Sequence, residues 1–237
     1  MTTCIPLSFS TSPSRLRTSC RIVLAAAMAT LSIVASAQVA TVSGLESLEA
    51  FVKNTKSGRA AFTQVVTSPA RDGKVAKTKT SSGSFEFLRP NRFKFIYQKP
   101  FEQSIVSDGQ TLWLHDVDLN QVTARKLAQV LGGTPAAVIA AAADLKTLQA
   151  DFILVPRPDK DGLEWVEATP KAKDGQVQSI LVGFKESGKG SELAVLEILD
   201  SFGQRSVMRF SQFEVNPALA ATSFQFKPPA GADVIRQ

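Results

Sequence analysis

The 237-residue sequence contains one histidine, His115, so histidine-dependent catalysis has a single candidate. A serine hydrolase would use it as general base for a nucleophilic serine, which often lies in a Gly-x-Ser-x-Gly turn. That motif does not occur, and His115 lies in a strand-like run, Leu112 to Asp116. We therefore predict that the protein is not an enzyme, and a hydrolase that depends on His115 is the alternative.

Three oxygen-bearing residues imitate the start of a calcium loop: Asp116, Asp118 and Asn120. The sixth position of such a loop needs glycine and the twelfth needs a bidentate glutamate. Those positions hold Gln121 and Leu127, so the segment is predicted to be a hairpin turn. The sequence also lacks a phosphate-binding glycine loop and a cluster of metal ligands. We expect neither a metal nor a cofactor.

Arg89 stands between the runs Phe87-Leu88 and Pro90-Asn91, where one strand ends and the next begins. Two interpretations are open. Most arginines in turns are solvated cations. The alternative is a guanidinium at the rim of a cavity, where its planar fork of donors would bind backbone carbonyls left unpaired by a cover.

Alternating apolar residues indicate the strands around Arg89. Phe85 and Phe87 flank Glu86, and Phe93, Phe95 and Tyr97 follow at the same spacing of two. This period is typical of a strand with one face toward an apolar interior. Phenylalanine supplies apolar area without a polar group that needs a partner. Such a sheet holds either an ordinary core or an apolar ligand.

Turn signals recur along the chain and separate runs rich in Val, Ile, Phe and Thr, as β-hairpins require. The spacing predicts an antiparallel meander that curls into a sandwich or barrel. The turn signals are Asp72-Gly73, Asp108-Gly109, Asp161-Gly162, Asp174-Gly175, Gly188 to Gly190 and Phe202-Gly203.

Two helices are expected. A capping box of Ser43 and Glu46 opens the first, which we expect to continue to Gly58. Thr134-Pro135 opens the second, which continues over residues 136–146. Its alanine-rich sequence is apolar nearly all round, so it must be covered. It is either a plug that stabilises one end of a barrel or a lid over a ligand cavity.

The N-terminus has the features of a secretory signal. Arg15, Arg17 and Arg21 precede an apolar run over 22–34, and Ala35-Ser36-Ala37 is a cleavage site. We predict a signal peptide over 1–37 and a single periplasmic domain over 38–237. Both cysteines lie in the signal, so the mature chain has no disulfide. Removal of three arginines and no acid lowers the net charge from +6 to +3, too little for a nucleic-acid partner.

Several ordered motifs together resemble the LolA-type periplasmic carriers of outer-membrane lipoproteins. The resemblance implies a mostly β fold, α+β by element count: an incomplete antiparallel β barrel with helices covering its concave apolar face. The matching motifs are Ala61-Phe62-Thr63-Gln64, Arg89-Pro90-Asn91-x-Phe93, Val106-Ser107-Asp108-Gly109-x-Thr111-Leu112-Trp113, Gln121-Val122-Thr123, Gly133-Thr134-Pro135 and Phe224-x-Phe226-x-Pro228-Pro229-x-Gly231.

The resemblance also implies partners and residue roles. Lipid-modified lipoproteins would be accepted from an inner-membrane ABC transporter and passed to an outer-membrane receptor by a monomeric carrier. Arg89 matches the arginine that holds the lid, and Pro135, Val138 and Ile139 belong to the matching lid helix. Glu86 stands where many relatives have tryptophan, which puts the cavity lining in question. The candidate residues for binding acyl chains are Phe62, Phe85, Phe87, Phe93, Phe95 and Trp113.

Two further functions remain open on this scaffold. One is a carrier of another amphiphile, such as a glycolipid or phospholipid. The other is a regulatory sensor that binds lipids and signals to a membrane partner. A sensor would normally need an additional partner-binding domain, and the 200 residues of the predicted mature chain leave no room for one.

Overall fold

The computed structural model describes residues 43–70, 75–131, 134–173, 175–188 and 190–237. The predicted signal peptide and the Asp72-Gly73 turn lie outside these residues. Twelve strands are described: β1 (Ser57–Ser68), β2 (Lys77–Leu88), β3 (Arg92–Lys99), β4 (Gln103–Asp108), β5 (Thr111–Asp116), β6 (Gln121–Lys126), β7 (Phe152–Lys160), β8 (Leu163–Pro170), β9 (Val177–Ser187), β10 (Gly190–Asp200), β11 (Arg205–Val215) and β12 (Asp233–Arg236).

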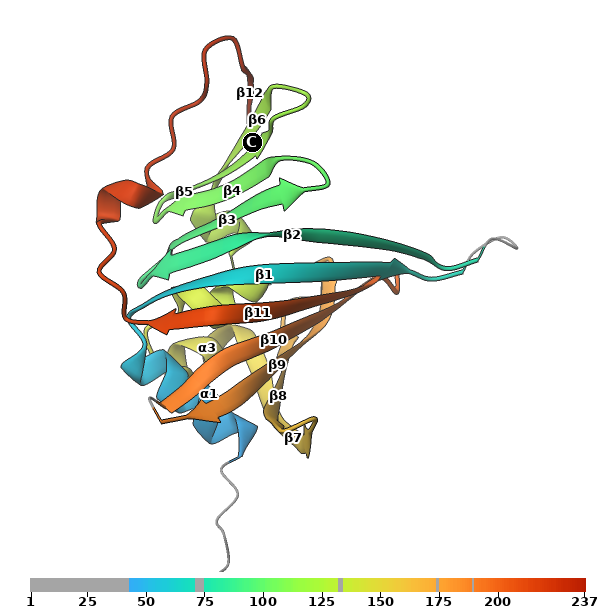
Figure 1. Cartoon of the computed structure of the whole chain (residues 1–237), viewed down its shortest axis with the longest axis vertical. Helices are drawn as coiled ribbons and strands as arrows, with labels where there is room; N and C mark the ends of the chain where they lie inside the picture. Colours follow the sequence, from blue (N-terminus) through green and yellow to red (C-terminus); the bar gives the residue numbers. More distant parts are fainter. Residues whose placement is uncertain (1–42, 71–74, 132–133, 174, 189) are drawn as a thin grey trace, which may run out of the picture. The chain divides into compact units, whose positions relative to one another are not determined.

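These strands form one sheet in the order β12-β6-β5-β4-β3-β2-β1-β11-β10-β9-β8-β7 (Figure 1). Neighbouring strands are antiparallel, except that β12 runs parallel to β6. The outermost strands β12 and β7 do not pair with each other, so the sheet is an open barrel. The predicted fold class, an incomplete antiparallel β barrel, is confirmed.

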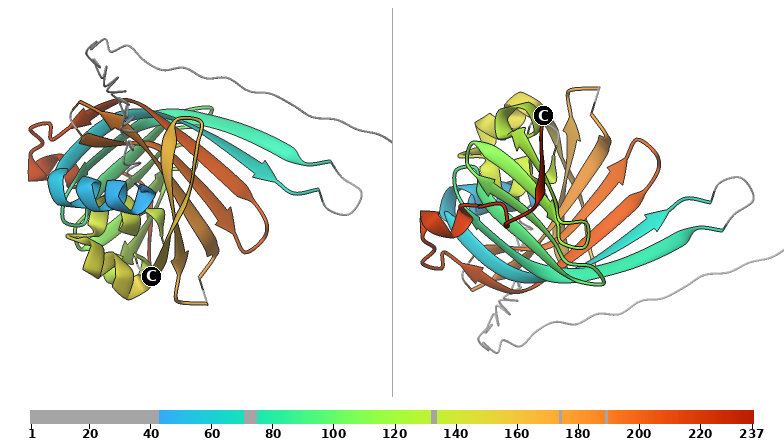
Figure 2. Two further views of the ribbon diagram at one scale, coloured as in Figure 1. Left: turned by 90° about the horizontal axis from the view of Figure 1, so that it is seen from below. Right: turned by 90° about the horizontal axis from the view of Figure 1, so that it is seen from above.

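The described residues include five short helices beside the sheet. Figure 2 shows the sheet curving around α1 and the segment that follows β6. The core unites Leu48, Phe51 and Val52 of α1 with inward-facing residues of the strands. The helices are α1 (Gly44–Asn54), α2 (Leu127–Val130), the π-helical turn η1 (Ala137–Ala141), α3 (Leu145–Asp151) and the 3-10 turn η2 (Ala221–Phe224).

The first helix begins as predicted. The Ser43 side chain accepts a hydrogen bond from the backbone of Glu46, whose carboxylate accepts one from the Ser43 backbone, which completes the capping box. Its predicted end at Gly58 is wrong, because α1 stops at Asn54 and Gly58 already lies in β1. A Cβ atom at Gly58 would lie 2.3 Å from the Phe87 ring, so this glycine serves strand packing and not helix termination.

Close contact between α1 and the sheet depends on Gly44. A Cβ atom there would lie 2.0 Å from the carbonyl oxygen of Trp165 in β8, too close for any side chain. Glycine therefore lets the first turn of the helix lie against the strand backbone. This contact places Phe51, one turn from the end of α1, over the concave face of the sheet.

The hairpin predictions hold where the structure describes them. Asp108-Gly109 joins β4 to β5, and Asp161-Gly162 joins β7 to β8, with both glycines at positive φ. The residues that imitate a calcium loop join β5 to β6, and the Asp116 carboxylate accepts a hydrogen bond from the backbone of Leu119. The period of two and the turn residues thus placed the strands correctly.

The only tyrosine of the chain gives a spectroscopic test of this packing. Burial raises the pKa of Tyr97 to about 12, whereas an unfolded tyrosine titrates near pH 10. The unfolded chain therefore loses the phenol proton first, and stability falls as the pH rises above about 10. We expect tyrosinate absorbance to appear with a midpoint about two pH units higher in folded than in denaturant-unfolded protein. A folded midpoint near 10 would contradict the buried position.

Candidate functional site

A continuous row of aromatic rings runs along the concave face of β1, β2 and β3 and ends at Phe51 of α1. We call it the aromatic column, and its members in spatial order are Phe51, Phe87, Phe85, Phe95, Phe62 and Tyr97. Successive ring centroids lie 6.0, 5.5, 4.4, 6.0 and 5.0 Å apart. Offset and edge-on rings at these distances attract each other beyond simple burial. The column is thus a rigid apolar strip along the inside of the sheet.

Five of the six residues predicted to bind acyl chains lie together on this face. Phe85 stands opposite Phe95 and Phe87 opposite Phe93 in the β2–β3 pairing. Each of the five is at most 8% exposed, so in this structure they form a closed core. The five are Phe62, Phe85, Phe87, Phe93 and Phe95.

The sixth, Trp113, does not join them, and its predicted place in the cavity lining is wrong in this structure. Its neighbour Leu112 pairs with Ser107, which pairs with the inward-facing Phe93. Alternation therefore turns Trp113 to the convex face. There its ring lies 5.5 Å from that of Phe226 in the C-terminal segment. Its indole nitrogen donates to Asp108 at 3.1 Å.

Glu86 also lies on the convex face, which answers the question it raised about the lining. Its carboxylate binds Arg59 of β1 and Lys94 of β3, each at 2.8 Å, so one acid bridges three strands. Partial burial alone would raise its pKa, but hydrogen bonds from Lys94 and Arg59 outweigh that effect and lower it. Phe85 and Phe87 on either side still supply the aromatic face.

Arg89 joins three elements at one end of the aromatic column. Its Nε donates to the carbonyl of Thr55, the C-cap of α1, at 2.8 Å. Its Nη1 donates to the carbonyl of Ala142, directly after η1, at 3.0 Å. The guanidinium carbon lies 5.2 Å from the Phe51 ring centroid and 5.1 Å from that of Phe87. The cation therefore lies against aromatic faces and is largely shielded from solvent.

The environment of Arg89 is costly for a cation. Burial lowers its pKa to about 10. Within the described residues no carboxylate pairs with it, and its buried Nη2 atom has no hydrogen-bond partner. A buried donor without a partner typically costs about 1–3 kcal/mol. Two hydrogen bonds to backbone carbonyls thus hold the closed arrangement around Arg89, and the hydrogen-bonding capacity of the guanidinium is not fully used.

The segment predicted as one helix over 136–146 is broken in two. The π-helical turn η1 ends at Ala141, Ala142 is extended, and α3 starts after its N-cap Asp144. The sequence pattern missed this break because alanine favours helix throughout. The extended Ala142 directs its carbonyl to Arg89, and Asp144 accepts the hydrogen bond of the Thr147 backbone at 2.7 Å.

We call residues 134–142 the cover segment. Val138 and Ile139 are 0% exposed and belong to the same core as the phenylalanines. Pro135 stands at its start, where the Thr134 hydroxyl donates to the carbonyl of Leu131. The cover segment therefore fills the concave side of the sheet, and the structure is in a closed state.

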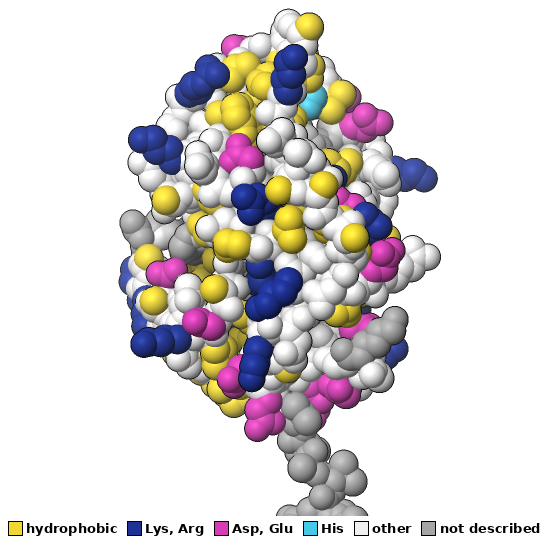
Figure 3. Space-filling model, turned by 90° about the vertical axis from the view of Figure 1, so that its left-hand side faces the viewer, with side chains coloured by type: hydrophobic (Ala, Val, Ile, Leu, Met, Phe, Trp, Pro, Cys, Tyr) yellow, Lys and Arg dark blue, Asp and Glu magenta, His cyan; other side chains and the backbone are white. Residues whose placement is uncertain are grey.

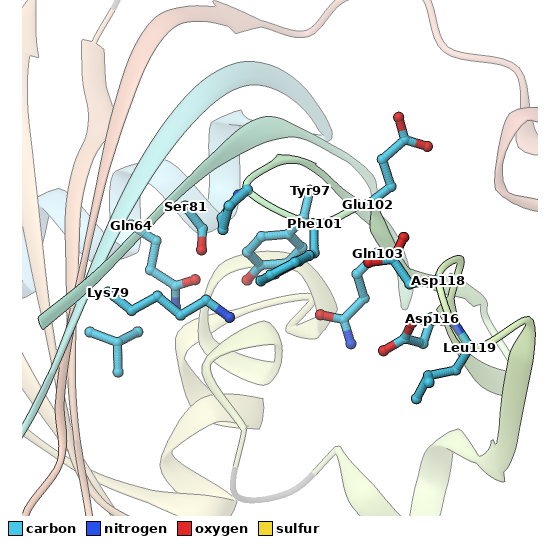
Figure 4. A pocket seen from close by; sticks show the side chains of 12 residues that line it. Gln64, Lys79, Ser81, Tyr97, Phe101, Glu102, Gln103, Asp116, Asp118 and Leu119 are labelled. Carbon is cyan, nitrogen blue, oxygen red and sulfur yellow. Dashed lines mark hydrogen bonds between the residues drawn. The ribbon is translucent and has the colours of Figure 1, made fainter. Parts of the chain in front are cut away.

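Two openings border this core. The edge cleft, of about 650 Å³, lies between the β5–β6 and β8–β9 regions, and its lining includes Leu112, Leu114, Val130, Asp151, Lys171 and Val177. The rim pocket, of about 420 Å³, lies at the far end of the aromatic column from Arg89 (Figure 4). Its lining includes Gln64, Lys79, Ser81, Tyr97, Phe101 and Gln103.

The residues considered for catalysis are not assembled into a reactive site in the described part of the chain. The His115 ring lies 5.9 Å from that of Phe226, and its Nε2 has no hydrogen-bond partner. Among the described residues no group of three or more His, Cys, Asp or Glu could hold a metal ion.

The described helices include none that is long and apolar enough to cross a membrane. Lys and Arg side chains are interspersed with acidic and apolar ones on the face in Figure 3.

Comparison with known proteins gives a consistent result. Residues 53–227 match the family model of the outer membrane lipoprotein carrier protein LolA. The chain is 69% identical over 209 residues to the outer-membrane lipoprotein carrier protein of Albidiferax ferrireducens, covering 88% of this chain and 98% of the relative. It is 56% identical over 202 residues to that of Methylibium petroleiphilum, with coverages of 85% and 94%.

A solved LolA superfamily structure from Nitrosomonas europaea shares 15% identity, covers 77% of this chain and 96% of its own, and gives a TM-score of 0.45. That likeness is too weak to add to the assignment. The family match over most of the chain and the identity of 69% are sufficient by themselves. The chain belongs to the LolA family of outer-membrane lipoprotein carrier proteins.

Proposed function

We propose that this protein is a periplasmic chaperone that shelters the acyl chains of lipoproteins between the two membranes. In this proposal it receives them from an inner-membrane ABC transporter and delivers them to an outer-membrane receptor. The observation that carries the proposal is the aromatic column, a long apolar strip closed by the cover segment. Residues 1–37 act as the export signal in this proposal, and the mature chain begins at Gln38.

Hydrocarbon burial sets the energetic scale of this task. A triacyl anchor has on the order of 40 methylenes, so its exposure to water would cost roughly 30 kcal/mol at about 0.8 kcal/mol for each. Phenylalanine rings can shelter such chains without specific hydrogen bonds. Because similar apolar area is hidden before and after each transfer, the net free energy of transfer is small. The direction of transport must then come from the partners, and the carrier needs gating and no catalytic step.

Arg89 and the cover segment are the proposed gate. Acyl chains can reach Phe85, Phe87 and Phe95 only if Val138 and Ile139 leave the core. That movement breaks the hydrogen bond from Arg89 to Ala142. A ligand that binds only the open state has an apparent affinity reduced by the fraction of open molecules. The contacts of Arg89 thus weaken binding and help the carrier to release its cargo.

The function is tested by release of lipoprotein from membranes. We expect purified mature protein, residues 38–237, to bring newly made lipoproteins from spheroplasts into the soluble fraction as stoichiometric complexes. The acyl chains supply the binding energy, so a variant lipoprotein whose acylated cysteine is replaced by serine should not form the complex. Complexes with phospholipid or glycolipid and none with lipoprotein would favour the alternative carrier.

The gate is tested with Arg89→Leu, which removes both hydrogen bonds to carbonyls. We expect this variant to load lipoprotein but to transfer it to the receptor at least tenfold more slowly, because the closed state no longer competes with the ligand. The measurement is the time course of transfer from the soluble complex to outer-membrane vesicles.

Arg92→Leu is the matched control, since Arg92 lies at the same corner and its side chain makes no hydrogen bond or ion pair to another described residue. Its transfer should be normal. Arg89→Lys keeps the charge but loses the planar guanidinium with its several donors. Its transfer rate should therefore lie between those of the wild-type protein and Arg89→Leu. Normal transfer by Arg89→Leu would exclude the gating role.

A further inference from the structure

The concave face changes from apolar to polar along the strands. On five consecutive strands, the inward-facing residue is apolar toward Arg89 and becomes polar toward the opposite end. The changes are Phe62 to Gln64 on β1, Phe85 to Ser81 on β2, Phe95 to Tyr97 on β3, Ile105 to Gln103 on β4 and Leu114 to Asp116 on β5.

Strand pairing places these polar residues in two adjacent rows. Gln64 stands opposite Ser81 in the β1–β2 pairing. Tyr97 stands opposite Gln103, which in turn stands opposite Asp116. Tyr97 stands opposite Gly83, so the row of Tyr97, Gln103 and Asp116 lies one inward-facing position nearer to Arg89 than the Gln64–Ser81 pair. Cross-strand neighbours on one face lie about 5 Å apart, and both groups line the rim pocket, so together they form a stepped polar band at the mouth of the column. The sequence of a single strand does not reveal this band, because the band combines residues of five strands that only the pairing register brings together.

The rim pocket opens on this band, and Figure 4 shows its side chains converging from β1 to β5. The Tyr97 ring contacts Phe62, the last phenylalanine of the column, with centroids 5.0 Å apart. Lys79 holds its ammonium 5.1 Å from the Phe101 ring centroid at the outer edge. Apolar and polar groups therefore meet inside one cavity.

Several donors in the rim pocket are not used by the protein. The Tyr97 hydroxyl and the side chains of Ser81 and Gln103 make no hydrogen bond to another described residue, while the Gln64 amide donates to Ser206 at 2.7 Å. Hydroxyl, amide and ammonium donors suit carbonyl acceptors. An acyl chain in a lipid carries such an acceptor at one end only, in its ester or amide linkage.

We propose that the rim pocket binds the ester- and amide-linked head of the acylated cargo, so that the hydrocarbon tails extend along the aromatic column toward Arg89. This inference rests on the proposed function. The reverse orientation is disfavoured by the Arg89 end of the column. There α1 packs over the column, the Nε of Arg89 is bound to the carbonyl of Thr55, and the rings of Phe51 and Phe87 lie against the guanidinium. The structure thus assigns a polarity to the bound lipid.

Photo-crosslinking of a tripalmitoylated cysteinyl peptide tests the orientation. The probe carries one diazirine, either at the end of an acyl chain or in the peptide next to the modified cysteine. With mature protein, the peptide diazirine should crosslink within 97–103 and 116–119. The chain-end diazirine should crosslink to Phe87, Val138 or Ile139. The proposal would be overturned if the peptide diazirine crosslinked at the Arg89 end and the chain-end diazirine at the rim pocket. Crosslinks of the peptide diazirine confined to the edge cleft would also overturn it.

Removal of two donors gives an independent readout. Tyr97→Phe combined with Gln103→Leu should lower the affinity for the tripalmitoylated peptide about tenfold, as expected for two lost hydrogen bonds. Binding of a hexadecane-linked fluorophore, which has no ester or amide at this position, should not change. Gln98→Leu, on an exposed side chain of the same hairpin, is the control for both ligands.

The outcomes separate this inference from the proposed function. If the wild-type protein binds the tripalmitoylated peptide and the double variant binds it equally well, the role of the rim pocket is wrong and the carrier function stands. The same conclusion follows if the double variant loses both ligands to the same degree. If the wild-type protein does not bind the peptide, the carrier function fails and this inference fails with it.

Discussion

The concave face of an open sheet must be kept from water, and one guanidinium holds its cover in place. Arg89 ties the end of α1 to the cover segment through two backbone carbonyls and lies against two rings of the aromatic column. Among the described residues, the same cation has no carboxylate partner, and one of its buried nitrogens has no hydrogen-bond partner. Such contacts define the geometry of the closed state but contribute little to its stability. That combination suits a cavity that must close when empty and open for a ligand.

Alternation along the strands assigns opposite tasks to the two faces of the sheet. On the inward side, β2 and β3 carry phenylalanine from the Arg89 end up to Phe85 and Phe95. The outward side carries the ion pairs of Arg59, Glu86 and Lys94, which join β1, β2 and β3. The ion pairs that stabilise β1, β2 and β3 thus lie on the convex face, which no ligand needs to contact. The residues of the inner face are then free of structural hydrogen bonds up to the level of the polar band.

Much of the fold could be predicted from local signals. The period of two placed β2 and β3, the Asp108-Gly109 turn placed β4 and β5, and the capping box placed the start of α1. The face of Trp113 could not be predicted reliably, because it depends on register relative to β3 and on Phe226, more than 100 residues later. The helix break at Ala142 could not be predicted either, because it also depends on a contact with a residue distant in the sequence. Its extended backbone is explained by the contact with Arg89, which no propensity encodes. The rim pocket combines residues of five strands and appears only when their registers are fixed.

Hydrogen exchange of the cover segment, measured on empty protein and on protein loaded with tripalmitoylated peptide, tests the central claim most directly. If acyl chains replace Val138 and Ile139 on the aromatic column, amides over 134–142 should exchange at least tenfold faster in the loaded protein, while β2 and β3 keep their protection. Unchanged protection of the cover segment on loading would show that the lipid binds elsewhere, and would contradict this account.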